Sequence, residues 1–468
     1  MNPARRRTLR RLAGATALGL WWQRIGHARV VDSAPDVVFL EPSDPEFARH
    51  RTIFNKRFTE TPRVIAACRT ESGAVKAVRY ANRLGLPIAV KSGGHSLEGF
   101  SLNEGGMVID LSAMNALTLD SDHRLRAEPG CRLAQVSDYL LPRGRLLPAG
   151  TCGGVGLAGL TLGGGYGFFS RSFGLTCDSL RRVRMVDGDG RIRDSRDEPR
   201  LLWACRGGGN GALGVITQME YVTHVAPEVL QTFRYRYRVG SKEEAFAVAS
   251  KWASLMQALP PQAYSALTAN SRTITILVTT FSPGAPDGPL AGILAVLAES
   301  ASRVEQPRRE PLQIALRAYV GQKGPLYFKN ASGGFYHRVE DVRPALATIF
   351  EAVLTEPGII FQINTFGPLP AAPESAFAHR QFAFIGELQS YWDKPQQQAR
   401  AMDTIARLQR SLTESGVDAH YANYPDINLG NWAHAYYGRE NYTELQALKR
   451  LYDPANAFRY PQSIRLPD

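Results

Sequence analysis

Cysteine is scarce in this chain of 468 residues, which contains five: Cys68, Cys131, Cys152, Cys177 and Cys205. No two of them form a C-x-x-C pair, and no Cys/His spacing fits a zinc site, so we predict no metal centre. An odd number leaves at least one thiol outside any disulfide. That thiol needs another explanation, such as a covalent bond to a bound molecule.

The chain also lacks a dense block of basic residues beyond its N-terminus. The net charge is +12, but residues 1–31 contain seven arginines and no acidic residue, which leaves +5 for the rest of the chain. A nucleic-acid binding surface requires clustered positive charge. We therefore expect no nucleic-acid partner.

No apolar run is long enough to cross a membrane. The candidate stretch 12–22, which follows Arg6 and Arg7, is much shorter than the ~20 residues that a membrane span requires. Paired arginines before a weakly apolar stretch resemble a twin-arginine signal, which exports folded proteins. We interpret residues 1–31 as this signal and expect an exported protein, periplasmic or extracellular. A disordered basic tail is the alternative, and no clear small-x-small cleavage site is present.

Fixed-period repeats are absent as well, and the sequence instead has two regions that differ in their pattern of apolar residues and glycines. From 36 to 224, short apolar runs alternate with glycine-rich turns. This pattern predicts strands at 64–67, 88–90 and 108–111 and helices at 71–84 and 132–141. The first part is therefore of mixed α and β structure.

From 225 to 420 the pattern changes to strands with alternating polar and apolar residues and to longer helices. Strands are expected at 231–237, 359–366 and 382–388, and helices at 242–259 and 342–354. Strands followed by helices of this kind predict an antiparallel sheet backed by helices, which is a second domain. The end of the chain, 442–468, is expected to form one helix and a tail.

Glycine is concentrated in three segments. The first, Lys91 to Ser96, follows an expected strand, and its adjacent glycines Gly93 and Gly94 let backbone N–H groups turn toward an anion such as a pyrophosphate. It is not a Walker loop, because the lysine precedes the glycines. A simple tight turn remains the alternative for this segment taken alone.

The other two segments are 150–167 and 206–216. The first contains Cys152 and the run Gly163 to Gly167, which lacks the strand, helix and acidic residue of a dinucleotide-binding fingerprint. So many glycines around one cysteine indicate backbone packed against a flat ligand. The run at 206–216 has the same character.

These three segments, together with Tyr421-Ala422-Asn423-Tyr424 and the aromatic C-terminal tail, resemble the berberine bridge enzyme-like oxidases of the vanillyl-alcohol oxidase (p-cresol methylhydroxylase) superfamily. The resemblance covers roughly 36–468. It implies an α+β fold with a two-part, PCMH-type FAD-binding domain at 36–224. A substrate domain with an antiparallel sheet backed by helices would follow at 225–420, and the segment 421–468 would return to the FAD domain.

The resemblance implies FAD held by two covalent bonds, from His95 to the flavin 8α-methyl group and from Cys152 to flavin C6. Such bonds would retain the cofactor outside the cell and make the flavin a stronger electron acceptor. The alternatives are a turn histidine that caps a backbone group, and a cysteine that acts as a small buried hydrophobe.

Further cofactor contacts follow from the same resemblance. Val155 matches a position that admits or excludes oxygen, and a valine there favours an oxidase. The other expected cofactor-binding residues are Ser92, Gly93, Gly94 and Ser96 at the pyrophosphate, Gly163, Gly164, Gly165, Tyr166 and Gly167 near the flavin ring or ribityl chain, and Asp178, Val215 and Ile216 near the flavin and adenosine parts. Gly156 and Asn423 are also expected to bind the cofactor.

Tyr421 matches the tyrosine that looks like the proton acceptor in sugar-oxidising relatives. A tyrosine of ordinary pKa, about 10, needs a nearby cation or hydrogen bonds to act as a base near neutrality. We expect Tyr421 and Asn423 on one face of a strand and Tyr424 on the other. Tyr421 could instead be a packing aromatic. Tyr424 and Gln362 are the other catalytic candidates, and Gln362, Glu387 and Gln389 are expected either to bind hydroxyl groups or to be ordinary sheet residues.

The leading hypothesis is an FAD-dependent oxidase that passes hydride to flavin N5 from a hydroxylated sugar, oligosaccharide or secondary metabolite and reduces O2 to H2O2. A dehydrogenase with another electron acceptor, a flavin-binding protein without turnover and a protein without cofactor are the alternatives. The expected partners are a small-molecule substrate and O2. Neither the substrate nor the oligomeric state follows from the sequence.

Overall fold

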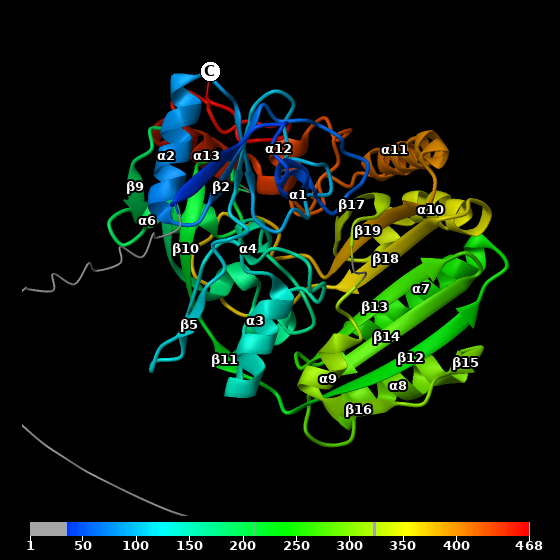
Figure 1. Cartoon of the computed structure of the whole chain (residues 1–468). Coiled ribbons are helices and arrows are strands. Elements are labelled where there is room, and N and C mark those ends of the chain that lie inside the picture. Colours follow the sequence, from blue (N-terminus) through cyan, green and yellow to red (C-terminus); the bar gives the residue numbers. More distant parts are fainter. Residues whose placement is uncertain (1–34, 210, 322–323, 468) are drawn as a thin grey trace, which may run out of the picture. The chain divides into compact units, whose positions relative to one another are not determined.

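The structure is a computed structural model, and it describes residues 35–209, 211–321 and 324–467. The expected export signal, 1–31, lies outside these residues. Within them, no helix is both long and apolar enough to pass through a membrane. Figure 1 shows mixed α and β structure on one side and a large sheet on the other.

A small sheet carries the first glycine segment. Its strand order is β1 (Val37–Leu40), β2 (Val64–Cys68), β4 (Met107–Asp110), β3 (Ile88–Lys91), and β2, β4 and β3 are parallel. Helix α2 (Glu71–Arg83) joins β2 to β3; Thr70 caps its start by accepting the N–H of Gly73 at 3.0 Å. Because β3 ends at Lys91, the segment Ser92 to Ser96 lies at the carboxyl end of this sheet.

A second, antiparallel sheet holds the next parts. Its order is β5 (Leu117–Leu119), β6 (Arg124–Ala127), β10 (Val215–Val222), β8 (Leu180–Val186), β9 (Ile192–Asp194). Helices α3 (Leu133–Leu140) and α4 (Leu157–Leu162) flank the segment that contains Cys152. Leu445 and Leu448 of α13 (Arg439–Tyr452) and Trp432 of α12 (Trp432–Tyr437) share a buried core with β8 and β10.

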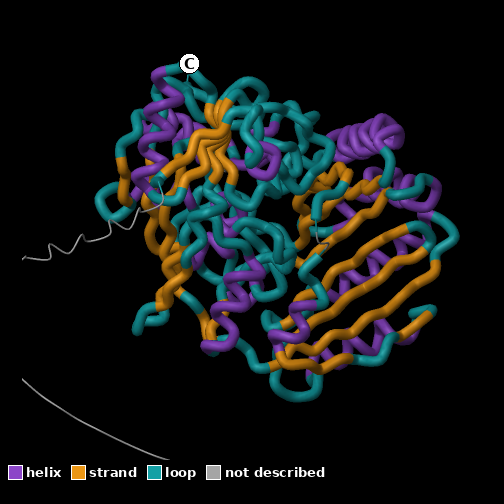
Figure 2. Tube along the Cα trace, viewed as in Figure 1, coloured by secondary structure: helices purple, strands orange, loops and turns teal. Residues whose placement is uncertain are grey.

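The large sheet is antiparallel throughout, with the order β15 (Arg303–Val304), β12 (Val229–Arg238), β14 (Thr273–Thr280), β13 (Ala263–Asn270), β18 (Ile359–Thr365), β19 (Phe384–Trp392), β17 (Tyr327–Tyr336); β16 (Arg308–Pro311) also pairs with β12. Helices α7 (Lys242–Met256), α8 (Gly288–Glu299) and α10 (Arg343–Thr355) lie behind it in Figure 2, and α11 (Gln398–Glu414) packs on β17 and β19.

Alternation along the strands decides which face these helices cover. Tyr235, Tyr237, Ile276, Leu267 and Phe361 are buried in one core with Trp252 of α7 and Ile349 of α10. The neighbouring residues on each strand point to the opposite face, because successive side chains of a strand alternate. That opposite face, which we call the open face, turns toward the viewer in Figures 1 and 2.

Most expected elements are confirmed within one to three residues at each end, β19 being the exception because it continues to Trp392. Helix α7 ends at Met256 rather than at the expected Leu259, which is followed by two prolines, and a residue before proline is disfavoured in a helix. The strand expected at 421–424 is wrong. The chain makes a turn there, and the N–H of Tyr424 donates to the carbonyl of Tyr421 at 2.9 Å. The domain boundaries near 224 and 420 stay a prediction.

Candidate active site

A cavity of about 480 Å³ lies between the glycine segments and the open face of the large sheet. Its walls include Ala158 and Gly159 of α4 and side chains from β17, β18 and β19. Many residues expected from the sequence line it: Ser92, Gly93, Gly94, His95, Ser96, Cys152, Val155, Gly156, Tyr166, Gly167, Ile216, Gln362, Tyr421, Asn423 and Tyr424. Segments far apart in the chain therefore meet at one site.

The two glycine segments pack directly on each other. A Cβ atom on Gly93 would lie 2.4 Å from the backbone nitrogen of Gly156, and one on Gly156 would lie 2.6 Å from the nitrogen of Gly93. Gly94 has a φ of 67°, a left-handed conformation that favours glycine. These positions need glycine because two backbones touch, and the contact brings the segments of His95 and Cys152 together.

His95 is held flat against an aromatic ring. Its imidazole stacks on Phe54 with ring centroids 4.1 Å apart and an angle of 17° between the planes. Burial, with the nearby charge of Arg132, lowers the pKa of His95 to about 4. The imidazole is therefore neutral near pH 7, and a neutral ring nitrogen has the lone pair that a covalent bond requires.

Cys152 differs from the other cysteines by its position. All five thiols are free, so the odd number does not single out Cys152, contrary to the argument from the sequence. Cys68, Cys131, Cys177 and Cys205 are buried, whereas Cys152 is half-buried and lines the cavity. Burial raises the pKa of the Cys152 thiol above its usual value, partly offset by backbone hydrogen bonds from Gly154 and Val155.

Tyr421 and Tyr424 both face the cavity, because a turn rather than a strand connects them. Their rings contact edge to face, with centroids 5.0 Å apart. The Tyr421 hydroxyl accepts the N–H of Gly165 at 2.9 Å and the Asn423 amide N–H at 2.9 Å. Burial raises the pKa of both tyrosines, and among the described residues no lysine or arginine hydrogen bonds either phenol.

Glu387 is the acidic side chain on the cavity wall. It comes from β19, is 8% exposed, and accepts an N–H of the Asn330 amide at 3.1 Å. Burial raises the pKa of Glu387 to about 7, against the opposing effect of hydrogen bonds from Gln389, Asn330 and Tyr424. A carboxylate of this kind is half ionised near neutral pH and can act as a general base.

Hydrogen bonds connect the tyrosines to the sheet. The hydroxyls of Tyr424 and Tyr166 are 2.8 Å apart, and the Asn364 amide donates to Tyr166 at 3.2 Å. Gln362 in turn donates to Asn364 Oδ1 at 2.7 Å. The Tyr264 hydroxyl also donates to Asn364 Oδ1, at 2.5 Å. Sequence patterns did not point to Asn330, Asn364 or Tyr264. Polar residues within the expected strands, such as Gln362 and Asn364 in 359–366, are the signal that could have drawn attention to this network.

Several expected cofactor-binding residues lie behind the cavity wall. Gly163 and Gly164 pack against Asn423 and Phe377, which leaves no room for a side chain, and Gly165 holds Tyr421 in place. Val215 is buried in the core of the small sheet, and Asp178 forms an ion pair with Arg380. The structure therefore places these residues as supports of the wall rather than as part of its surface.

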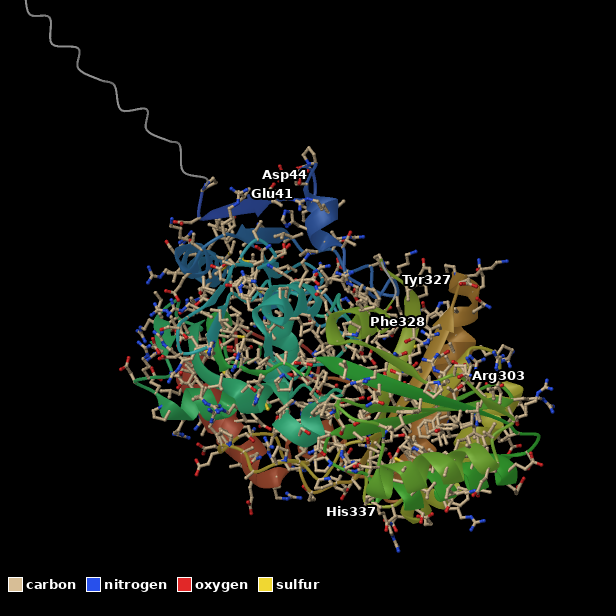
Figure 3. All side chains as sticks on the ribbon, turned by 90° about the horizontal axis from the view of Figure 1, so that it is seen from below. Glu41, Asp44, Arg303, Tyr327, Phe328 and His337 are labelled. Atoms are coloured by element: carbon tan, nitrogen blue, oxygen red, sulfur yellow. The ribbon has the colours of Figure 1, made fainter. Side chains whose placement is uncertain are left out.

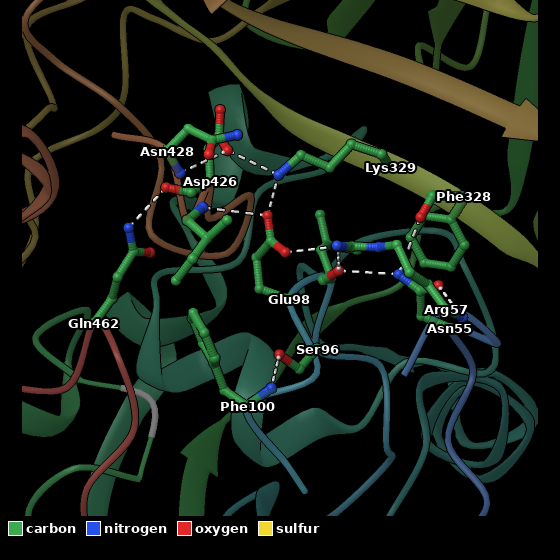
Figure 4. A network of polar contacts seen from close by, with 12 residues as sticks. Asn55, Arg57, Ser96, Glu98, Phe100, Phe328, Lys329, Asp426, Asn428 and Gln462 are labelled. Carbon is green, nitrogen blue, oxygen red and sulfur yellow. Dashed lines mark hydrogen bonds and ion pairs between the residues drawn. The ribbon is translucent and has the colours of Figure 1, made fainter. Parts of the chain in front are cut away.

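A buried cluster of charged side chains joins three of the segments that form the site (Figure 4). Lys329, fully buried on β17, donates to Glu98 and to Asp426, the latter at 2.8 Å. Arg57 donates to the other oxygen of Glu98 at 2.6 Å. Glu98 follows the His95 segment, Lys329 precedes Asn330, and Asp426 follows the tyrosine turn. One ammonium group therefore connects the elements that carry His95, Asn330 and Tyr424.

Comparison with known proteins agrees with this arrangement. A family model described as "FAD binding domain" matches residues 62–196, and one described as "Berberine and berberine like" matches 420–465. An uncharacterized FAD-linked oxidoreductase of Bacillus subtilis, YgaK, is 31% identical over 440 residues, which cover 90% of this chain and 95% of the relative. The chain belongs to the berberine bridge enzyme-like family of FAD-linked oxidases.

Two further proteins are similar to this chain over most of its length. The aclacinomycin-N/aclacinomycin-A oxidase of Streptomyces galilaeus is 31% identical over 482 residues, covering 88% of this chain and 87% of the relative. The crystal structure of a glucooligosaccharide oxidase from Acremonium strictum, described as revealing a novel flavinylation, has a TM-score of 0.82 at 24% identity and covers 92% of this chain and 96% of that one. The PCMH-type α+β fold is thereby confirmed.

The residues of this family member fit FAD. A Cβ atom on Gly159, which lines the cavity, would meet no atom within 4 Å, so the glycine leaves space at the wall. The paired glycine segments bring backbone close to that space, as a flat ligand with phosphate groups requires. The protein is an FAD-dependent oxidoreductase.

Proposed function

We propose that this enzyme is an oxidase that removes two electrons from a hydroxyl-bearing carbon of a sugar, an oligosaccharide or a glycosylated metabolite, with O2 reduced to H2O2. Glu387, a buried carboxyl with a pKa of about 7 on the cavity wall, is the observation that carries the proposal. FAD, when bound, supplies the hydride acceptor at N5. Two relatives are named as oxidases of an aclacinomycin and of glucooligosaccharides, which supports this substrate class.

Glu387 takes the hydroxyl proton in this proposal. The assigned base is therefore Glu387 and no longer Tyr421, which was the candidate from the sequence. Two donors already occupy the Tyr421 hydroxyl oxygen, and burial raises the pKa of this phenol. Tyr424 hydrogen bonds Glu387 and Tyr166, and therefore holds the carboxylate in place. Among the described residues no group donates to Asn330 Oδ1, which is buried beside Glu387, so a substrate hydroxyl can.

His95 and Cys152 would hold FAD by two covalent bonds. Three observations support this: both side chains line the same cavity, the imidazole is neutral at pH 7, and the Cys152 thiol is free. The structural neighbour with a described flavinylation has the same fold. Arg6, Arg7 and the short apolar stretch after them support export through the twin-arginine route.

Anaerobic mixing with a panel of sugars, alcohols and amines tests the function. We expect sugars or glycosides to bleach the flavin absorbance and Glu387→Gln to slow bleaching by about 10²–10⁴-fold, the usual contribution of a general base. Bleaching of equal rate in E387Q would reject Glu387 as the base. A flavin that no member of the panel bleaches would instead support a binding protein without turnover.

A further inference from the structure

One row of side chains runs across the open face of the large sheet, away from the cavity. Glu387 pairs with Gln362, Gln362 with Thr268, Thr268 with Thr275, and Thr275 with Arg236. Directly opposed residues in antiparallel strands point to the same face. Because neighbouring strands lie about 4.8 Å apart, the three steps from Gln362 to Arg236 span roughly 15 Å. We call these five residues the cross-strand row.

The middle of the cross-strand row is open to a ligand. Thr268 and Thr275 are half-buried, and among the described residues none hydrogen bonds either hydroxyl. Next to them, Ala266 and Leu277 belong to an apolar cluster with Phe168 and so are covered. The row therefore presents hydroxyl groups along a path that begins at the proposed base and leaves the cavity at Gln362.

Arginines gather where the cross-strand row ends. Arg234, Arg236 and Arg238 point to the open face from β12, and Arg303 of β15 stands directly opposite Arg236. Opposed like charges destabilise a sheet. Glu305 offsets part of this charge through ion pairs with Arg234 at 3.5 Å and Arg236 at 2.7 Å.

Positive charge remains at this end. Within the part of the chain that the structure describes, no carboxylate forms an ion pair with Arg238 or Arg303. Figure 3 shows Arg303 at the outer edge of the molecule, accessible to solvent. An anion bound here would relieve the repulsion between the opposed guanidinium groups, since Arg forms charge-assisted hydrogen bonds with carboxylates.

We propose that the cross-strand row is an extended subsite for an acidic oligosaccharide. Sugar hydroxyls lie along Gln362, Thr268 and Thr275, and a carboxylate remote from the oxidised carbon binds Arg238 and Arg303. The inference rests on the proposed function, since it names the substrate class of the same site. A neutral oligosaccharide makes the same hydroxyl contacts but lacks the contact with the arginines, and hence binds more weakly.

Isothermal titration calorimetry tests this subsite without turnover when O2 is excluded and the flavin is first reduced with dithionite, because a reduced flavin cannot accept hydride. The probes are a linear gluco-oligosaccharide of about four rings and the same chain with a glucuronate at its non-reducing end. The wild-type holoenzyme is expected to bind the acidic probe at least about tenfold more tightly, a difference of ~1.4 kcal/mol. Arg238→Ala and Arg303→Ala should each reduce that preference, and added salt should weaken it.

Two further variants separate the hydroxyl and charge contributions. Thr275→Val, which keeps the shape and removes the hydroxyl, should weaken both probes by a similar factor. Arg196→Ala, an exposed arginine after β9 (Ile192–Asp194), should change neither. Equal affinity of the wild type for the two probes, or a preference unchanged in R238A and R303A, would overturn the subsite. If one of these outcomes is found and a neutral sugar still bleaches the flavin, the subsite is rejected but the proposed oxidation stands.

Discussion

The pH dependence of the reaction follows from the burial of Glu387. A base must be ionised to accept a proton, and burial raises the pKa of this carboxyl from 4.5 to about 7. The value of kcat/KM should therefore rise with pH through about 7 and then level off. Two pH units below that pKa, about one molecule in a hundred has an ionised carboxyl, so kcat/KM at pH 5 should be about 100-fold below the plateau.

Steady-state oxygen consumption from pH 5 to 9 measures this profile. Glu387→Gln should remove the rise near pH 7, and Glu414→Gln, an exposed glutamate on α11, should retain it. A wild-type profile that is flat from pH 5 to 7, or an unaltered rise in E387Q, would refute the assignment. A rise only above pH 9 would point back to a tyrosine base.

The same carboxyl makes the free energy of unfolding decrease as the pH rises, whereas kcat/KM increases. The folded-state pKa of Glu387 is raised, so its favourable contribution is complete below pH 4.5 and is lost as the pH rises through 7. A shift from 4.5 to about 7 corresponds to about 3 kcal/mol. Between pH 4.5 and pH 8 the wild type should therefore lose stability relative to E387Q in urea denaturation.

Three other variants give separate tests. Lys329→Met should destabilise the fold by about 3–5 kcal/mol in urea denaturation, because it leaves Glu98 and Asp426 buried without their cation. Lys329→Arg keeps a cation and should recover part of the loss. Equal stability of the two variants would contradict this. Gly93→Ala should reduce flavin content because its Cβ meets the Gly156 backbone at 2.4 Å, while Gly292→Ala on α8, with open space around it, should not. Val155→Leu should slow reoxidation by O2 but not anaerobic reduction; a wild type slow with O2 and fast with a dye would indicate a dehydrogenase.

Local patterns were sufficient for elements whose signals lie within a few residues. Helix α2 could be predicted because Val75 and Val78 recur at helical spacing and Gly85-Leu86-Pro87 ends it. The turn at Tyr421 could not, since alternation of aromatic residues is equally compatible with a strand, and a backbone hydrogen bond between Tyr424 and Tyr421 decides the conformation.

The site depends on contacts between distant segments. His95 and Cys152 could be paired only through the family resemblance, because glycine-to-glycine packing of Gly93 on Gly156 brings their segments together. The importance of Glu387 was missed because its pKa depends on burial beneath residues from other elements. A sequence identifies a glutamate on a strand, but not the dielectric environment around it.

Peptide mapping of the denatured enzyme tests the central claim most directly, namely that one FAD is attached at both His95 and Cys152. The expected result is a single flavin that links the peptide of His95 to the peptide of Cys152, with His95→Ala and Cys152→Ala each leaving the flavin on the remaining residue. Flavin that separates completely from the wild-type protein on acid precipitation, with both peptides at their unmodified masses, would contradict the account.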